Sequence, residues 1–233
     1  MSDLPDVAMI LAAGFGTRMG ALTEDRPKPL IEAGGKALID HALDAAAAAG
    51  VSRAVVNLHY RGDQIRRHLA GRRRPEIVFS EEPEILETGG GIVRALPLLG
   101  PAPFFSLNAD AIWTGAAPLP TLAAAWRGGR MDALLHLARR EDAVGHAGRG
   151  DFFRSDDGGL SRRGEAATAP YVFTGAQIIA PEAFVGAPRG AFSTNVVWDR
   201  LIARGRLFGV AHDGSWIDVG SPAGLALAEE ALR

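Results

Sequence analysis

Short apolar runs rich in β-branched and aromatic residues alternate with longer helix-like runs along most of this sequence. This alternation constrains the fold more than any other feature, because it favours strands joined by crossover helices. Strands are expected at 7–12, 54–58, 77–80, 104–108 and 133–138, and helices at 36–49, 63–69, 90–98 and 119–127. The chain is therefore predicted to be an α/β protein.

The alternation loosens at about residues 140–170, where the sequence is polar and rich in glycine. The strand-like segments 133–138 and 171–179 flank this stretch. A compact domain rarely carries so long a loop unless the loop binds something or forms a hairpin. We therefore expect a polar insertion, with a hairpin around the sequence DFFR, inside one domain that spans 1–233.

The composition excludes several classes of protein. The 233 residues are 47% hydrophobic with a formal net charge of −2, which indicates neither a nucleic-acid nor a membrane partner. No cysteine is present, so disulfides and thiolate metal sites are excluded and a reducing compartment is indicated. No stretch approaches the roughly 20 apolar residues of a membrane-spanning helix. We expect a cytoplasmic protein that acts on small molecules as a monomer or small homo-oligomer.

The first expected strand runs directly into a glycine-rich turn, GFGTR, at 14–18. Backbone N–H groups in such a turn can converge on an anion, and Gly14 and Gly16 would let a phosphate approach closely. Two other glycine-rich phosphate-binding motifs do not match the sequence at these positions. A dinucleotide fingerprint needs glycine where Met19 stands, and a Walker loop needs a Lys-Ser or Lys-Thr pair. Taken alone, the turn is a weak indication of a phosphate site.

Two cations, Arg18 and Lys28, strengthen that indication. Pro27 and Pro29 flank the lysine and restrict the backbone around it to extended conformations. A flexible side chain with a stiff base suits a phosphate ligand. Without the glycine turn upstream, a solvated surface lysine would be the simpler interpretation.

Two aspartates each follow an apolar, strand-like run. Asp110 ends the sequence FFSLNAD, and Asp218 lies in WIDVGSP. Open α/β sheets bind ligands at the carboxyl ends of their strands. Mg²⁺ takes one or two protein carboxylates and completes its shell with phosphate and water. The pair therefore predicts a Mg²⁺ site, although either aspartate alone is equally consistent with a turn cap.

The motifs LAAGFGTRM, RPKPL, LNAD and WIDVGSP, in this order, resemble those of the sugar-1-phosphate nucleotidyltransferases, and the likeness covers nearly the whole chain. Within that family the run EEPEILETGGGIVRALPLLG at 81–100 resembles the short bacterial N-acetylmuramate-1-phosphate uridylyltransferases of peptidoglycan recycling, as does the lack of a hexapeptide-repeat extension. The resemblance implies a Rossmann-like, GT-A-like three-layer α/β/α fold with a mixed, mostly parallel central sheet. It also implies nucleotidyl transfer, from UTP in this branch, to a sugar-1-phosphate with release of pyrophosphate.

The resemblance implies a role for each motif. The loop of Gly14, Gly16, Thr17 and Arg18 would wrap the triphosphate. The implied catalytic residues are Arg18, Lys28 and Asp110, and the implied Mg²⁺ ligands are Asp110 and Asp218.

The resemblance also implies two further groups of contacts. Those facing the base are Ala12, Gly14, Glu81 or Glu82, and the backbone of Thr88, Gly89 and Gly90. Those lining the sugar side are Asn108, Gly175 and Asn195.

One departure concerns the sugar phosphate. Many relatives carry a Glu-Pro-Lys run in mid-chain whose lysine meets this group, and the present sequence has none. Its counterpart region offers Arg162 and Arg163, so the cation for the sugar phosphate stays open. The absence counts against a glucose-1-phosphate thymidylyl- or uridylyltransferase.

Two other functions stay open. A mannose-1-phosphate or heptose-1-phosphate guanylyltransferase would share the phosphate motifs and differ at the base. A non-catalytic sugar-nucleotide-binding protein would need neither the two carboxylates nor the two cations. All four are present, which favours an enzyme.

Four further patterns give expectations for the structure. The glycines at 89–91 form a poor helix start, which indicates close approach by a ligand. The basic run 72–74 is expected to be a solvated helix cap. His136 is expected to be packed or solvated, not catalytic, and Trp198 is expected in the core.

Overall fold

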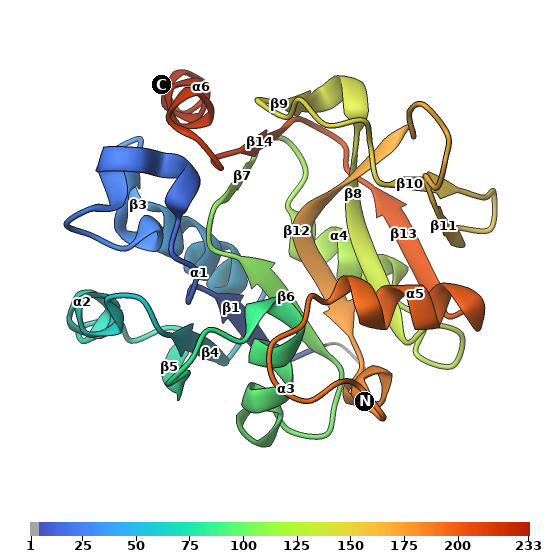
Figure 1. The fold of residues 1–233 in the computed structure, drawn as a ribbon, viewed down its shortest axis with the longest axis horizontal. Helices are drawn as coiled ribbons and strands as arrows, with labels where there is room; N and C mark the ends of the chain where they lie inside the picture. The colour runs from blue at the N-terminus through green and yellow to red at the C-terminus, as the bar shows by residue number, and fades with distance from the viewer. Residues whose placement is uncertain (1–4) are drawn as a thin grey trace.

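The computed structural model describes residues 5–233, and a twisted sheet runs through its centre (Figure 1). Its strands follow the order β11-β10-β12-β6-β1-β4-β5, with β8 beside β12 and β13 beside β8. Strands β6, β1, β4 and β5 are parallel, whereas β12 enters antiparallel to β6. The strands of this sheet are β1 Val7–Leu11, β4 Arg53–Leu58, β5 Glu76–Glu81, β6 Phe104–Asn108, β8 Ala133–Arg139, β10 Phe152–Arg154, β11 Leu160–Arg162, β12 Tyr171–Ile179 and β13 Leu207–Ala211.

Helices cover both faces of the sheet because its central strands are apolar on both sides. On β1, Ala8 and Ile10 pack in one cluster with residues of α1, α2 and α4, while Met9 packs in another with residues of α3 and α5. The helices are α1 Leu38–Ala48, α2 Gly62–Leu69, α3 Glu87–Leu99, α4 Pro118–Ala125, α5 Asn195–Ala203 and α6 Pro222–Ala231. This confirms the predicted three-layer α/β/α arrangement around a mixed sheet.

Two smaller sheets flank the main one. Strand β14, Trp216–Asp218, lies between β7, Ala111–Trp113, and β9, Ala143–Val144. Strand β2, Glu32–Ala33, pairs with β3, Lys36–Ala37, so the first helix begins at Leu38 and not at residue 36 as expected. The short 3₁₀ helices are Thr17–Thr23, Lys28–Leu30, Arg140–Asp142 and Pro181–Phe184. Within 5–233, no helix has the length and apolar character needed to cross a bilayer.

The polar stretch at 140–170 forms the expected hairpin. Strand β10 pairs with β11, and Phe152 of β10 also pairs with Tyr171 at the start of β12. The hairpin therefore extends the main sheet at one edge (Figure 1). Trp198 is buried as predicted, and its Nε1 donates to Gln177 Oε1 at 3.0 Å.

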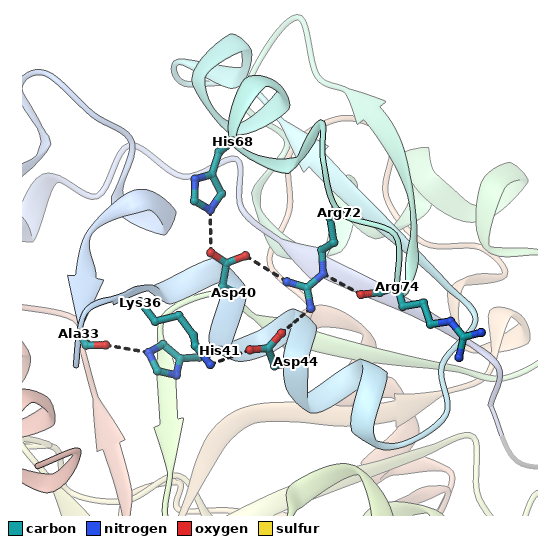
Figure 2. Close-up of polar contacts among 8 residues, drawn as sticks. All are labelled: Ala33, Lys36, Asp40, His41, Asp44, His68, Arg72 and Arg74. Atoms are coloured by element: carbon teal, nitrogen blue, oxygen red, sulfur yellow. Dashed lines mark hydrogen bonds and ion pairs between the residues drawn. The ribbon is translucent and has the colours of Figure 1, made fainter.

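The basic run after α2 ties two helices together (Figure 2). Arg72 donates to Asp40 Oδ1 at 3.1 Å and to Asp44 Oδ1 at 2.5 Å, and His68 Nε2 lies 2.7 Å from Asp40 Oδ2. The prediction of a solvated cap is therefore wrong for Arg72, whose side chain is only 15% exposed. Asp40 and Asp44 are four residues apart and so share the face of α1 that meets it.

A buried histidine pair lies between β8 and the end of β13. His136 is fully buried, its Nδ1 lies 2.9 Å from Thr174 Oγ1, and its ring centroid is 4.8 Å from that of His212. Burial, reinforced by His212, lowers the pKa of His136 to about 3. The expectation that His136 is packed is confirmed.

This depressed pKa predicts acid sensitivity. As the pH is lowered, the unfolded chain takes up a proton at His136 near pH 6.5, whereas the folded chain does so only at about pH 3. The free energy of unfolding therefore decreases as the pH is lowered from 6.5 to 3. For His136→Gln, the loss of unfolding free energy from pH 7.5 to 5.5 should be smaller than in the wild type by about 1 kcal/mol. Urea unfolding at both pH values measures this. The control is His41→Gln, at a half-buried histidine of α1 whose Nε2 lies 2.9 Å from the Ala33 carbonyl oxygen. An equal pH dependence in wild type and His136→Gln would contradict the assignment.

Candidate active site

Three adjoining cavities lie at the carboxyl ends of β1 and β6. Leu11 and Asp110 line all three. We call them the loop cavity, of 220 Å³ around the 14–18 turn, the Glu82 cavity, of 190 Å³ beside β5, and the large cavity, of 320 Å³ between β12, α5 and β14. This is the edge of the sheet at which the sequence places its polar motifs.

The loop cavity brings together most of the residues predicted for the triphosphate. Its wall includes Gly14, Gly16, Thr17, Arg18 and Lys28, and also Ala12, which was predicted to face the base. A Cβ on Gly14 would meet nothing within 4 Å, so open space lies above this backbone. Gly16 has a φ of +66°, and a Cβ there would lie 2.8 Å from Lys28 Cβ. The loop therefore requires glycine at 16, both for its backbone conformation and for the approach of Lys28.

Lys28 is only 8% exposed, and its Nζ donates to Asp110 Oδ2 at 2.5 Å. The proline-flanked lysine thus points at the very carboxylate predicted to hold metal. Sequence reasoning placed both residues in the site but did not pair them with each other.

Aromatic contacts hold the tip of the glycine-rich loop, and sequence reasoning missed them. The Phe15 ring lies 5.4 Å from that of His59 and 5.6 Å from that of Tyr60, centroid to centroid. Tyr60 in turn donates to the Thr23 carbonyl at 2.9 Å. The segment after β4 therefore fixes the loop from outside.

The Glu82 cavity has a buried polar chain as its wall. Asn57 Oδ1 accepts from the Ala12 amide at 2.7 Å, and Asn57 Nδ2 donates to Glu82 Oε1 at 2.7 Å. Glu82 is buried, whereas the Glu81 side chain is 60% exposed and pairs with Arg66. Of the two predicted glutamates, Glu82 is the one that reaches the cavity. Asn57 was missed, although an asparagine inside the apolar strand RAVVNL was a signal.

The first two glycines of α3 pack against another segment of the protein, residues 190–192, and do not face open space. A Cβ on Gly90 would lie 2.3 Å from the Gly190 carbonyl oxygen, and one on Gly89 would lie 2.4 Å from the Phe192 ring. Both amides donate to the Phe192 carbonyl, at 2.8 and 3.1 Å. The expectation that this run serves close approach by a ligand is wrong, because the chain at 190–192 makes that approach. Neither Gly89 nor Gly90 lines the cavities, whereas Thr88 lines two of them.

Asp110 and Asp218 come together through the small sheet. Asp218 on β14 lies opposite Ala111 on β7, and the Val219 amide donates to the Asp110 carbonyl at 3.2 Å. His146 Nδ1, 3.9 Å from Asp218 Oδ2, together with Arg18 and Lys28, holds the pKa of Asp218 below its usual value.

The donor chemistry of this pair fits a magnesium ion. Two carboxylates on one wall supply hard oxygen ligands and leave the remaining positions to phosphate and water. Within 5–233, no cluster of three or more His, Cys, Asp or Glu side chains could hold a metal by itself.

The large cavity brings together the three residues predicted for the sugar side, Asn108, Gly175 and Asn195. Gly175 has a φ of +85°, and a Cβ there would lie 3.0 Å from Asn108 Cβ, so the strand passes Asn108 only with glycine at this position. Arg162 also lines the cavity. Arg163 does not, since its guanidinium donates to the Gly164 and Ala166 carbonyls of its own turn.

Comparison with known proteins identifies the family. The family model of the MobA-like NTP transferase domain matches residues 8–177. The chain is 47% identical, over its full length, to the N-acetylmuramate alpha-1-phosphate uridylyltransferase of Caulobacter vibrioides, and the match covers 99% of that protein. The chain belongs to the sugar-1-phosphate nucleotidyltransferase family. A protein of the same name from Neisseria meningitidis serogroup B is 35% identical to this nucleotidyltransferase, over 92% of the chain and 93% of the relative.

The nucleotidyltransferase also resembles a guanylyltransferase over part of its sequence and a solved thymidylyltransferase structure in its fold. The mannose-1-phosphate guanylyltransferase catalytic subunit beta of Drosophila pseudoobscura pseudoobscura is 39% identical, but over 45% of the chain and 30% of that protein. The solved structure of a putative glucose-1-phosphate thymidylyltransferase from Bacillus anthracis matches 97% of the chain and 94% of that chain, with a TM-score of 0.80 and 17% identity. The predicted fold and the predicted enzyme class are both confirmed.

The buried ion pair gives a prediction about Lys28. Lys28→Ala should lower kcat/KM of the nucleotidyltransferase by about 10²–10³-fold, because it removes a positioned cation where phosphate charge develops. Steady-state pyrophosphate release measures this. Lys36→Ala is the matched control, since Lys36 is an exposed lysine paired with Asp44, and it should leave kinetics unchanged. Wild-type kinetics in Lys28→Ala would contradict the assignment.

Proposed function

We propose that this enzyme transfers a uridylyl group from UTP to N-acetylmuramate α-1-phosphate, which gives the UDP-sugar and pyrophosphate. The full-length likeness to the Caulobacter vibrioides uridylyltransferase carries the proposal. The guanylyltransferase alternative is less well supported, because its match covers under half of the chain. The reaction fits a cytoplasmic enzyme of peptidoglycan recycling that works as a single domain.

The proposed chemistry is an in-line attack by a sugar-phosphate oxygen on the α-phosphorus of the nucleotide. The nucleophile is already an anion at neutral pH, so the chain needs no general base. Its tasks are to align two anionic substrates and to stabilise the leaving pyrophosphate. The loop amides from Gly14 to Arg18, with the Arg18 and Lys28 side chains, would hold the triphosphate in the loop cavity.

We assign Asp110 and Asp218 to Mg²⁺. The ion would screen the repulsion between the two phosphate groups when it is bound. Asp110 is the acidic residue that lines all three cavities, which supports its assignment to an ion shared by both substrates. The lowered pKa of Asp218 keeps that carboxylate ionised and ready to ligate.

We assign the base to the Glu82 cavity and the sugar to the large cavity. Leu11, Ala13 and Ile85 supply apolar wall for a planar base, and Glu82 supplies buried acceptor oxygens. Uracil presents an N3–H donor between two carbonyl acceptors, so it needs an acceptor of this kind flanked by donors. Asn108, Gly175 and Asn195 would then face the sugar.

Substrate selection tests the proposal. With N-acetylmuramate α-1-phosphate as partner, UTP should give a far higher kcat/KM than GTP, CTP, dTTP or ATP, because the relatives that match nearly the whole chain are uridylyltransferases. Pyrophosphate release across a panel of nucleotides and sugar-1-phosphates measures this. A preference for GTP with mannose-1-phosphate or heptose-1-phosphate would overturn it.

A further inference from the structure

Arg162 is a positively charged residue of the large cavity whose role the sequence leaves open. It is the last residue of β11, on the hairpin formed by the polar insertion. Two arginines, Arg18 and Arg162, line this cavity, and Arg18 also lines the loop cavity. The two guanidinium groups therefore serve different parts of the site.

The register of the sheet sets Arg162 apart from the phosphates. Ala176 of β12 pairs with Leu107 near the end of β6, whereas Phe152 pairs with Tyr171, five residues nearer the start of β12. Because β12 runs antiparallel to β6, that start extends about 15 Å past the end of β6. Arg162 pairs with Phe152 and so overhangs the site from its outer rim.

The guanidinium of Arg162 is fixed in place. Its Nε donates to Asp199 Oδ1 at 2.7 Å, and its Nη2 donates to Asn195 Oδ1 at 3.0 Å. Its carbon lies 4.9 Å from the Phe152 ring centroid and 5.6 Å from that of Trp198. Nη1 has no hydrogen-bond partner within 5–233. Because Nη2 also donates to the Asn195 carbonyl at 3.2 Å, Nη1 is the nitrogen of this positioned guanidinium that is left to donate to an anion.

The charge of Arg162 is only weakly neutralised by its partner. The Asp199 side chain is 59% exposed, so water screens this ion pair. Asp151, which lines the same cavity, accepts from the Phe173 amide at 2.9 Å, and the ion-pair partner of Arg162 is Asp199 and not Asp151. Attraction for a further anion therefore remains at the guanidinium.

N-acetylmuramate differs from N-acetylglucosamine by a lactyl ether that ends in a carboxylate. Its phosphate must lie near Asp110 to react, which places the rest of the sugar in the large cavity toward the rim. Resting on the proposed function, we propose that Arg162 binds the sugar's carboxylate and selects acid-bearing hexosamine-1-phosphates over neutral ones. Many relatives have a lysine in the corresponding region that binds the sugar phosphate. Arg162 would instead bind the carboxylate of the sugar.

The test varies the sugar and the arginine together. Wild type, Arg162→Ala and Arg162→Lys are assayed with UTP and three partners: N-acetylmuramate-1-phosphate, its lactyl amide and N-acetylglucosamine-1-phosphate. Arg162→Ala should lose about 10- to 100-fold in kcat/KM for the acid alone, since a charge-assisted hydrogen bond is removed. Arg162→Lys should lose less. KM for UTP and the values for the two neutral sugars should stay unchanged.

Arg163→Ala is the matched control, because it removes an adjacent arginine that does not line the cavity. Equal losses on all three sugars would overturn the proposal and assign Arg162 to the phosphate. Loss on none would also overturn it. If Arg162→Ala fails to fold, the wild type alone can still contradict the proposal. It must have a higher kcat/KM for N-acetylmuramate-1-phosphate than for the lactyl amide. Failure of the proposed function looks different, because the wild type would then not turn over N-acetylmuramate-1-phosphate with UTP at all.

Discussion

The ion pair between Lys28 and Asp110 links every part of the site. It is short, and the side chains of the lysine and the aspartate are 10% and 30% exposed, so removing either partner would leave the other charge unpaired in a partly buried site. Asp110 also lines all three cavities, and Lys28 lines the loop cavity. Binding of the substrates would therefore exchange partners: the triphosphate takes the lysine while the metal takes the aspartate. The pair holds both side chains in place until that exchange.

Local backbone features place the two partners. The sequence predicted an extended backbone around Lys28, but Lys28–Leu30 form a 3₁₀ turn that follows the extended Pro27, so that prediction is wrong for Lys28. Gly16 gives the room that the lysine stem occupies. On the other side, β7 pairs with β14 and so brings Asp218, more than a hundred residues away in sequence, beside Asp110. The exchange thus depends on a small sheet outside the central one.

Much of this was predictable from the sequence, because the signals were local. The strand-to-glycine turn, the proline-flanked lysine and the aspartates after apolar runs each point to the edge of an α/β sheet. Contacts between distant segments left weaker signals. Nothing local distinguishes Glu82 from Glu81, and the choice depends on Asn57 from another strand. The glycines of α3 and Arg72 were misread because their partners, at 190–192 and on α1, are set by tertiary packing.

The most direct test of the exchange is Mn²⁺ binding, followed by electron paramagnetic resonance with and without UTP. The wild type should bind Mn²⁺ weakly alone and much more tightly with UTP, since phosphate oxygens complete the shell and draw Lys28 away from Asp110. Lys28→Ala should bind Mn²⁺ alone several-fold more tightly than the wild type, because its Asp110 has no competing cation, while Asp110→Asn and Asp218→Asn should lose the UTP-dependent site. Nucleotide-free affinity that is equal in wild type and Lys28→Ala, or tight binding that survives Asp110→Asn, would contradict the account.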